Sequence, residues 1–89
     1  MKHFNIIVRG SVQGVGFRHS ARIEANKSGI TGFVRNQPDG TVYIEAEGSD
    51  MQLHHFITWC EEGFTFSRVE RVIVMEGIIC NYTKFEVRI

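Results

Sequence analysis

The stretch ITGFVRNQPDGTVYIEAEG, residues 30–48, contains two segments of apolar and β-branched residues separated by a turn signal. In the second segment, residues 41–48, apolar side chains alternate with Tyr43 and two glutamates, which is typical of a strand with one buried face. The letters QPDG between the segments place proline and glycine as in a tight turn. The stretch therefore predicts a β-hairpin. The side chains expected to face the core are Val42, Ile44 and Ala46.

Residue patterns before this hairpin predict one strand and one helix. Residues 4–12 are rich in β-branched residues, and Phe4, Ile6 and Val8 share one face of an extended chain. After a turn that contains two glycines, apolar residues recur every fourth position, as on the buried face of a helix. Gly29 then stands where a left-handed C-cap glycine would end that helix. The apolar helix positions are Phe17, Ala21 and Ala25.

The residues after the hairpin predict a second helix and two more strands. Ser49 or Asp50 can cap a helix that ends at Gly63, because apolar residues in between follow the spacing i, i+3, i+4 and i+7. Residues 68–77 and 84–89 are predicted as strands. The order β-α-β-β-α-β with a short final strand predicts an α+β, ferredoxin-like split βαβ fold, with two helices on one face of an antiparallel sheet. The helix positions at that spacing are Leu53, Phe56, Ile57 and Cys60.

Length, composition and charge predict a single domain, residues 1–89, because a chain of 89 residues sustains one core. The hydrophobic content of 43% and the single proline favour a packed globule over disorder. Ten basic residues balance ten acidic ones, so the basic footprint of a nucleic-acid-binding protein is missing. No apolar run approaches the ~20 residues of a membrane-spanning helix. We therefore expect a cytoplasmic monomer without nucleic-acid or membrane partners.

The cysteines and histidines show no metal-binding or redox spacing. Cys60 and Cys80 lack the CxxC pattern, and two buried free thiols are expected. His54 and His55 are adjacent, so on a helix they point about 100° apart. His3 is expected at the surface. The sequence thus predicts no metal and no cofactor.

Other charged and aromatic side chains have ordinary structural explanations. Glu45 and Glu47 lie on the outer face of the predicted strand, and we expect solvated charges that discourage aggregation. Phe56 and Trp59 are expected in the core and at its boundary. His19 is expected to be a solvated helix residue, although its position would allow contact with a substrate.

The segment SVQGVGFRHS, residues 11–20, joins the first strand to the first helix and contains no acidic residue. Its glycines can let backbone N–H groups converge on an anion at a helix N-terminus, where the helix dipole favours negative charge. Arg18 adds a planar guanidinium suited to phosphate oxygens. The Walker pattern is missing, however, and His19 stands where GxGxxG requires its third glycine. On these residues alone, an anion-binding loop and a plain tight turn remain open, and Asn36 fits an ordinary turn asparagine.

Taken together, the glycine loop and the hairpin resemble the acylphosphatase family. The letters GSVQGVGFR, residues 10–18, and GITGFVRNQPDGTV, residues 29–42, match the family pattern in residue type and in spacing. The likeness covers most of residues 6–48, and the order of elements agrees beyond it. Ser28 and Phe64 depart from residues that the family often has, and both lie outside the two motifs.

The resemblance implies a ferredoxin-like enzyme that hydrolyses acyl phosphates to carboxylate and phosphate. It also implies that Arg18 and the loop amides bind the phosphate and that Asn36 positions the attacking water. The reaction suits these groups, because a carboxylate whose conjugate acid has a pKa of ~4 leaves without a general acid. A loose phosphoryl transition state, in turn, needs mainly positioning and electrostatics. The implied amides are those of Gln13, Gly14, Val15, Gly16, Phe17 and Arg18.

Two other functions remain open alongside this one. The first is a non-catalytic phosphate- or anion-binding module, similar to domains of larger carbamoyl-transferring proteins. Asn36 argues against it, because binding alone does not require that residue. The second is RNA binding, since GITGFVRN resembles the RNP1 motif, but the motif's other aromatic residues and its basic start are missing. The motifs specify only the phosphate end of a substrate.

Overall fold

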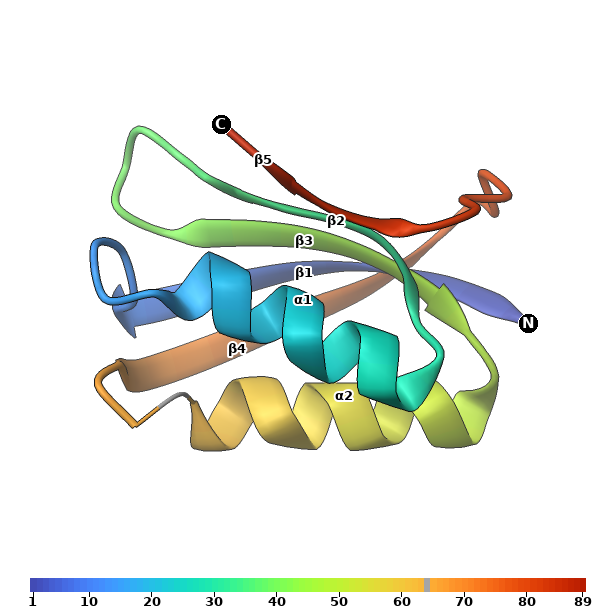
Figure 1. Ribbon diagram of the computed structural model, residues 1–89, viewed down its shortest axis with the longest axis horizontal. Coiled ribbons are helices and arrows are strands. Elements are labelled where there is room, and N and C mark those ends of the chain that lie inside the picture. Colours follow the sequence, from blue (N-terminus) through green and yellow to red (C-terminus); the bar gives the residue numbers. More distant parts are fainter. Residues whose placement is uncertain (64) are drawn as a thin grey trace.

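The computed structural model describes residues 1–63 and 65–89, which form a five-stranded sheet covered on one face by two helices (Figure 1). The predicted order of elements and the ferredoxin-like α+β fold are confirmed. Phe64 lies outside the described residues. The elements are β1 (Lys2–Ser11), α1 (Phe17–Ser28), β2 (Thr31–Asn36), β3 (Val42–Gly48), α2 (Asp50–Glu62), β4 (Arg68–Gly77) and β5 (Phe85–Arg88).

The strands follow the spatial order β4-β1-β3-β2-β5. Four of them form antiparallel pairs, as predicted, but β5 pairs with β2 in parallel. The expectation of a wholly antiparallel sheet is therefore wrong at this edge. The reason is the path of the chain: β4 ends at the end of the sheet where β2 begins, and residues 78–84 cross to the far edge there, so β5 runs in the direction of β2.

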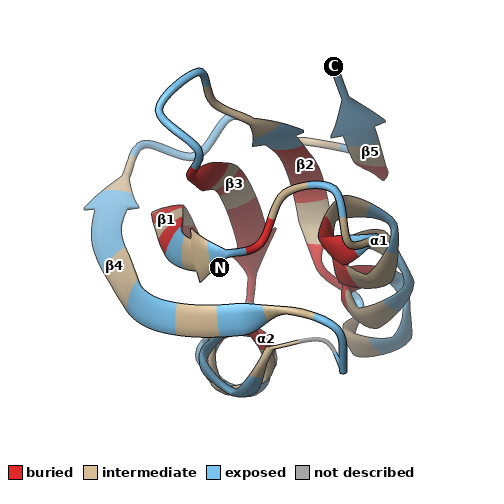
Figure 2. Ribbon diagram, turned by 90° about the vertical axis from the view of Figure 1, so that its left-hand side faces the viewer, coloured by how far each residue is buried: buried red, intermediate tan, exposed pale blue. Residues whose placement is uncertain are grey.

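The core lies between the helices and one face of the sheet. All three predicted positions of α1, Phe17, Ala21 and Ala25, are buried. Trp59 sits at the boundary of the core, with its ring centroid 5.3 Å from that of Phe17 and 6.1 Å from that of Phe56. Figure 2 shows the buried residues on the central strands and on the inward sides of the helices, whereas β4 is largely exposed. The sheet residues that complete the core include Ile6, Val8, Val34, Val42, Ile44 and Ala46.

The two helices end as the sequence predicts but begin in different ways. Gly29 caps α1 with φ 75°, and Gly63 follows the end of α2. Of the two predicted caps of α2, Ser49 is the one used: its side chain accepts a hydrogen bond from the backbone N–H of Gln52, whose side chain accepts one from Ser49 in return. This capping box satisfies amides that would otherwise lack partners. Within the described residues, no helix has the length and apolar character needed to cross a membrane.

Glu47 is buried on the sheet face opposite the helices, so the expectation of a solvated charge is wrong for it. The residue is 1% exposed, and its side chain accepts hydrogen bonds from the backbone N–H groups of Cys80 and Tyr82. The sequence pattern placed it on the outer face correctly but did not show that the segment after β4 covers this end of the sheet. Glu45, two residues earlier, is only partly buried.

His3 is also buried, contrary to expectation, because it is the cross-strand partner of Glu47. Its Nδ1 lies 2.6 Å from Glu47 Oε2. Burial by itself raises the pKa of Glu47, but the hydrogen bonds from Cys80 and His3 outweigh it, so the pKa lies below its ordinary value. Of the two thiols, Cys60 is buried as predicted, whereas Cys80 is exposed.

The pairing of Glu47 with several donors predicts a large effect of an isosteric change. We expect Glu47→Gln to lower the free energy of unfolding by about 3 kcal/mol. The glutamine NH2 group would face N–H donors that now bind the carboxylate oxygens, so these donors would lose their acceptor. Urea denaturation of this variant and of Glu61→Gln, an exposed glutamate of α2, provides the measurement and its matched control. Equal stabilities of the two variants would contradict the role assigned to Glu47.

Candidate active site

The loop between β1 and α1 has a backbone that favours glycine at two positions. Gly14 has φ 74° and Gly16 has φ 85°, both in the left-handed region that residues with a Cβ atom rarely adopt. Gly16 is the N-cap residue of α1, and no side chain caps the helix there. The first-turn N–H groups have no partner within a helix by geometry, so the loop presents them at the end of the sheet.

Gln13 anchors this loop to the turn between β2 and β3. Its side-chain Nε2 donates hydrogen bonds to the carbonyl oxygens of Gln37 and Thr41, both at 2.8 Å. Asp39 closes the turn, because its carboxylate accepts from the hydroxyl and the backbone N–H of Thr41. These two hydrogen bonds lower the pKa of Asp39. The loop is thereby held in a fixed position relative to the end of β2.

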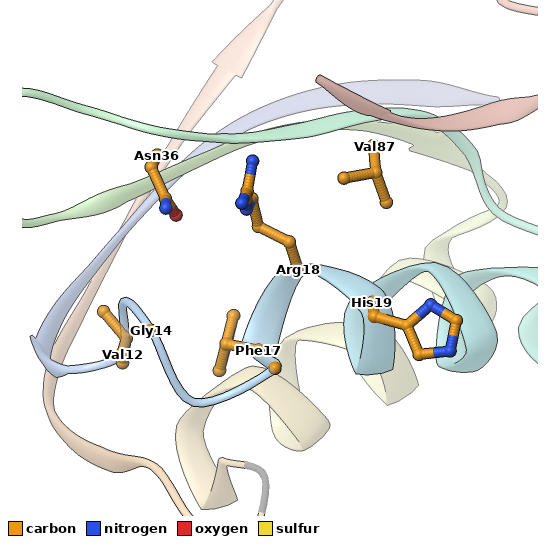
Figure 3. Close-up of a pocket in the computed structure, with 8 residues that line it drawn as sticks. Val12, Gly14, Phe17, Arg18, His19, Asn36 and Val87 are labelled. Atoms are coloured by element: carbon orange, nitrogen blue, oxygen red, sulfur yellow. The ribbon is translucent and has the colours of Figure 1, made fainter. Parts of the chain in front are cut away.

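Arg18 extends from the first turn of α1 toward β5, the C-terminal strand of the sheet. Its Nη1 donates a hydrogen bond of 2.9 Å to the backbone carbonyl of Arg88 in β5. Figure 3 shows the guanidinium between Asn36 and Val87. A basic residue in the first turn is unfavourable for the helix dipole, and α1 has no acidic residue there to offset it. The site therefore concentrates positive potential.

Asn36, the last residue of β2, points into the same space as Arg18 (Figure 3). Among the described residues, its Oδ1 is the buried side-chain oxygen or nitrogen without a hydrogen-bond partner. Leaving such a group unsatisfied costs about 1–3 kcal/mol. The atom is thus an acceptor that a water molecule or a ligand in the pocket can satisfy.

Arg18 and Asn36 line a pocket of about 170 Å³. A water molecule occupies about 30 Å³ of liquid volume, so the pocket is large enough for a ligand of the size of phosphate. His19 belongs to the lining, but its ring points away from Arg18 (Figure 3). The residues that line the pocket are Val12, Gly14, Gly16, Phe17, Arg18, His19, Asn36 and Val87.

Most residues that the sequence singled out are brought together here, with differences at two loop positions. Gln13 does not line the pocket, since its side chain reaches the neighbouring turn, and Val15 packs against the core. Val87 and Arg88 were missed by the sequence analysis. Their pattern indicated only a strand, and their place beside Arg18 depends on the parallel pairing of β5 with β2.

The fold and the pocket define a ferredoxin-like α+β protein with a cationic pocket where a glycine-rich loop meets a helix N-terminus. The family model named Acylphosphatase matches residues 4–87, so the chain belongs to the acylphosphatase family. The expected family is thereby confirmed over nearly the whole chain.

Relatives and solved structures agree with this assignment. An acylphosphatase of Ligilactobacillus salivarius is 46% identical over 88 residues, which cover 98% of each chain. One of Bacillus licheniformis is 49% identical over 76 residues, covering 85% of this chain and 84% of its own. The crystal structure of acylphosphatase from Bacillus subtilis has a TM-score of 0.97 at 38% identity and covers 100% of both chains.

A similar fold also forms a small part of a much longer protein. The crystal structure of full-length HypF in its phosphate- and nucleotide-bound form has a TM-score of 0.88 at 29% identity. The match covers 98% of this chain but only 12% of that one.

The family to which this chain belongs consists of hydrolases. The activity of the family is the hydrolysis of acyl phosphates to a carboxylate and phosphate.

The Gln13 anchor predicts a change in substrate binding when the loop is released. We expect Gln13→Met to lower the free energy of unfolding by about 1–2 kcal/mol and to raise the KM for an acyl phosphate, because the loop amides are then less well positioned. Gln52→Met is the matched control: it breaks the capping box of α2, at similar cost in stability, and leaves KM unchanged. Equal KM values in the two variants would argue against the anchor.

Proposed function

We propose that the backbone amides of residues 13–18 and the Arg18 guanidinium bind the phosphoryl group of an acyl phosphate while Asn36 holds the water that attacks it. The observation that carries this proposal is the unpartnered Asn36 Oδ1, buried at a pocket that Arg18 enters. An acceptor without a partner is the group needed to orient a water molecule, and the cation beside it suits an anionic substrate.

Phosphate binding is supported by the backbone of the loop. The left-handed glycines turn the chain at the start of α1, and the uncapped helix end offers N–H groups to an anion, as at other phosphate-binding helix N-termini. The Arg18 guanidinium adds charge-assisted hydrogen bonds while its bond to Arg88 fixes its direction. The backbone amides proposed to bind are those of Gln13, Gly14, Val15, Gly16, Phe17 and Arg18.

The chemistry requires little from side chains beyond this. The leaving carboxylate is a weak base, because its conjugate acid has a pKa of ~4, and it departs without protonation. The transition state spreads negative charge over the equatorial phosphoryl oxygens, where preorganised donors stabilise it most. Donors of this kind in comparable anion holes contribute about 2.7–4 kcal/mol each to the lowering of the barrier. The loop thus supplies both binding and rate.

Asn36 contributes orientation and not proton abstraction. A carboxamide is too weak a base to take a proton at neutral pH, but its Oδ1 accepts a hydrogen bond from water and holds the oxygen in line with the bond that breaks. Positioning of this kind removes an entropic part of the barrier. Its place at the end of β2, on a rigid strand, suits that task.

The roles of the two polar groups predict different kinetic effects. We expect Asn36→Ala to lower kcat by about 100-fold or more while the inhibition constant of inorganic phosphate stays nearly unchanged, because the water loses its orientation but the phosphate site is intact. Asn26→Ala, an exposed asparagine of α1, is the matched control. Steady-state hydrolysis of an aryl acyl phosphate measures both. Normal turnover in Asn36→Ala would refute the role.

For Arg18 we expect the loss of turnover and of phosphate inhibition together. Arg18→Ala removes the charge that holds the substrate in the ground state and in the transition state. Arg18→Lys keeps the charge but not the planar fork, so it restores only part of either. Arg22→Ala, one turn further along α1, tests for a general effect of charge. An Arg18→Ala variant that phosphate still inhibits normally would overturn the assignment.

The remaining expectations fit this function. We propose that the chain works as a monomer with a single catalytic domain, in which the loop, Arg18 and Asn36 line one pocket. We also propose a cytoplasmic setting, which the free thiols of Cys60 and Cys80 support, since disulfides are rare in reducing compartments.

A further inference from the structure

A second polar cluster lies at the opposite end of the sheet from the pocket, on the face away from the helices. His3 and Asn5 of β1 are the direct cross-strand partners of Glu47 and Glu45 of β3, so the register brings four polar side chains to one patch. Cys80, from the segment that connects β4 to β5, completes the group. Figure 1 shows this connection beside the N-terminus, at the other end of the sheet from the β1–α1 loop.

Three side chains of this cluster have their potential ligand atoms close together. One nitrogen of His3, one carboxylate oxygen of Glu45 and the Sγ of Cys80 lie within 4.8 Å of one another. Ligand atoms around a tetrahedral zinc ion, with bonds of about 2.0–2.3 Å, are about 3.3–3.8 Å apart. The cluster therefore needs to contract by only about 1 Å. The Cys80 side chain is exposed, so a rotation of that side chain can make the movement while the backbone N–H stays bonded to Glu47.

The hydrogen bonds of His3 leave Nε2 as the nitrogen that faces the cluster. Its Nδ1 lies 2.6 Å from Glu47 Oε2, the carboxylate–histidine arrangement that orients metal-binding imidazoles. Nε2 lies 2.7 Å from Asn5 Oδ1 and 3.5 Å from Glu45 Oε1. Two oxygen acceptors thus face one ring nitrogen. A positive species at Nε2, either a proton or a metal ion, satisfies that arrangement.

Glu45 is held in place by two tyrosines. The hydroxyl of Tyr43 donates to Oε2 at 2.7 Å, and the hydroxyl of Tyr82 donates to Oε1. A carboxylate oxygen has two lone pairs, so each can still bind a cation after accepting one hydrogen bond. Outer groups of this kind fix ligand direction in metal sites.

Gly77 keeps space open beside the cluster. It is the β4 partner of His3, and a Cβ atom built on it would lie 2.8 Å from His3 Cδ2 and 3.4 Å from His3 Nε2. The same Cβ would lie 3.2 Å from Asn5 Nδ2. A larger residue would press on both side chains. Glycine at this position therefore allows His3 and Asn5 to keep the arrangement described above.

We propose that His3, Glu45 and Cys80 bind a zinc ion, with Asn5 Oδ1 or water as the fourth ligand. A donor set of imidazole, thiolate and carboxylate suits zinc, whereas magnesium and calcium prefer oxygen alone. The eight residue-to-residue steps of β1 from His3 to Ser11 span about 26 Å, so the ion does not touch a substrate in the pocket. It ties the connection between β4 and β5 to the sheet, and its effect is on stability.

The test uses the whole chain after removal of bound metal with EDTA. We expect calorimetric titration with zinc to show one ion per chain, and excess zinc to raise the melting temperature by about 5 °C or more. Cobalt(II) in place of zinc is expected to give a thiolate-to-metal charge-transfer band. In Cys80→Ser we expect at least tenfold weaker zinc binding and no such band. Because Cys80 is exposed, this variant folds, and normal acyl phosphate hydrolysis verifies it.

The control variant is His55→Asn, which removes an exposed histidine that lies 3.1 Å from Glu24. It is expected to leave zinc affinity and the cobalt band unchanged. Zinc binding that is undiminished in Cys80→Ser, or lost in His55→Asn, would overturn the proposal. So would the failure of the folded chain to bind zinc at micromolar concentration, and the acceptors around His3 would then hold a protonated imidazole alone.

Discussion

The parallel direction of β1 and β2, with β3 between them and antiparallel to both, is the constraint on which the site depends. It places the end of β1, the end of β2 and the start of α1 at the same end of the sheet. Arg18 and Asn36 meet there although they belong to different elements. The parallel pairing of β5 with β2 then brings the Arg88 carbonyl to the same end, where it receives Arg18.

The two helices begin in different ways. At α2, Ser49 and Gln52 form a capping box, and Asp50 adds a negative charge that suits the dipole. At α1, Gly16 offers no side-chain cap and the first turn carries a cation. Both starts belong to one small fold with one core, so the difference is local.

Local patterns were enough to predict the elements, and long-range contacts were not. Alternation in the hairpin and the four-residue spacing from Phe17 identified strand and helix faces, because burial imposes those periods directly. The edge at which β5 pairs depends on the path of residues 78–84. No hydrophobic periodicity in the sequence indicates that path, so the place of Val87 and Arg88 beside the pocket was missed. For the same reason Glu47 was placed on the correct face but given the wrong environment, since the segment that buries it is distant in sequence.

The buried carboxylate of Glu47 and the pocket are connected through the C-terminal strand, β5. Glu47 fixes the backbone N–H groups of Cys80 and Tyr82, and these residues lie in the connection that leads into β5. The backbone of Lys84 then accepts a hydrogen bond from Gly32, where the parallel pairing with β2 begins. Order in the connection thus sets the register of β5. Because the carbonyl that anchors Arg18 is part of that strand, a carboxylate remote from the pocket helps to position the cation in it.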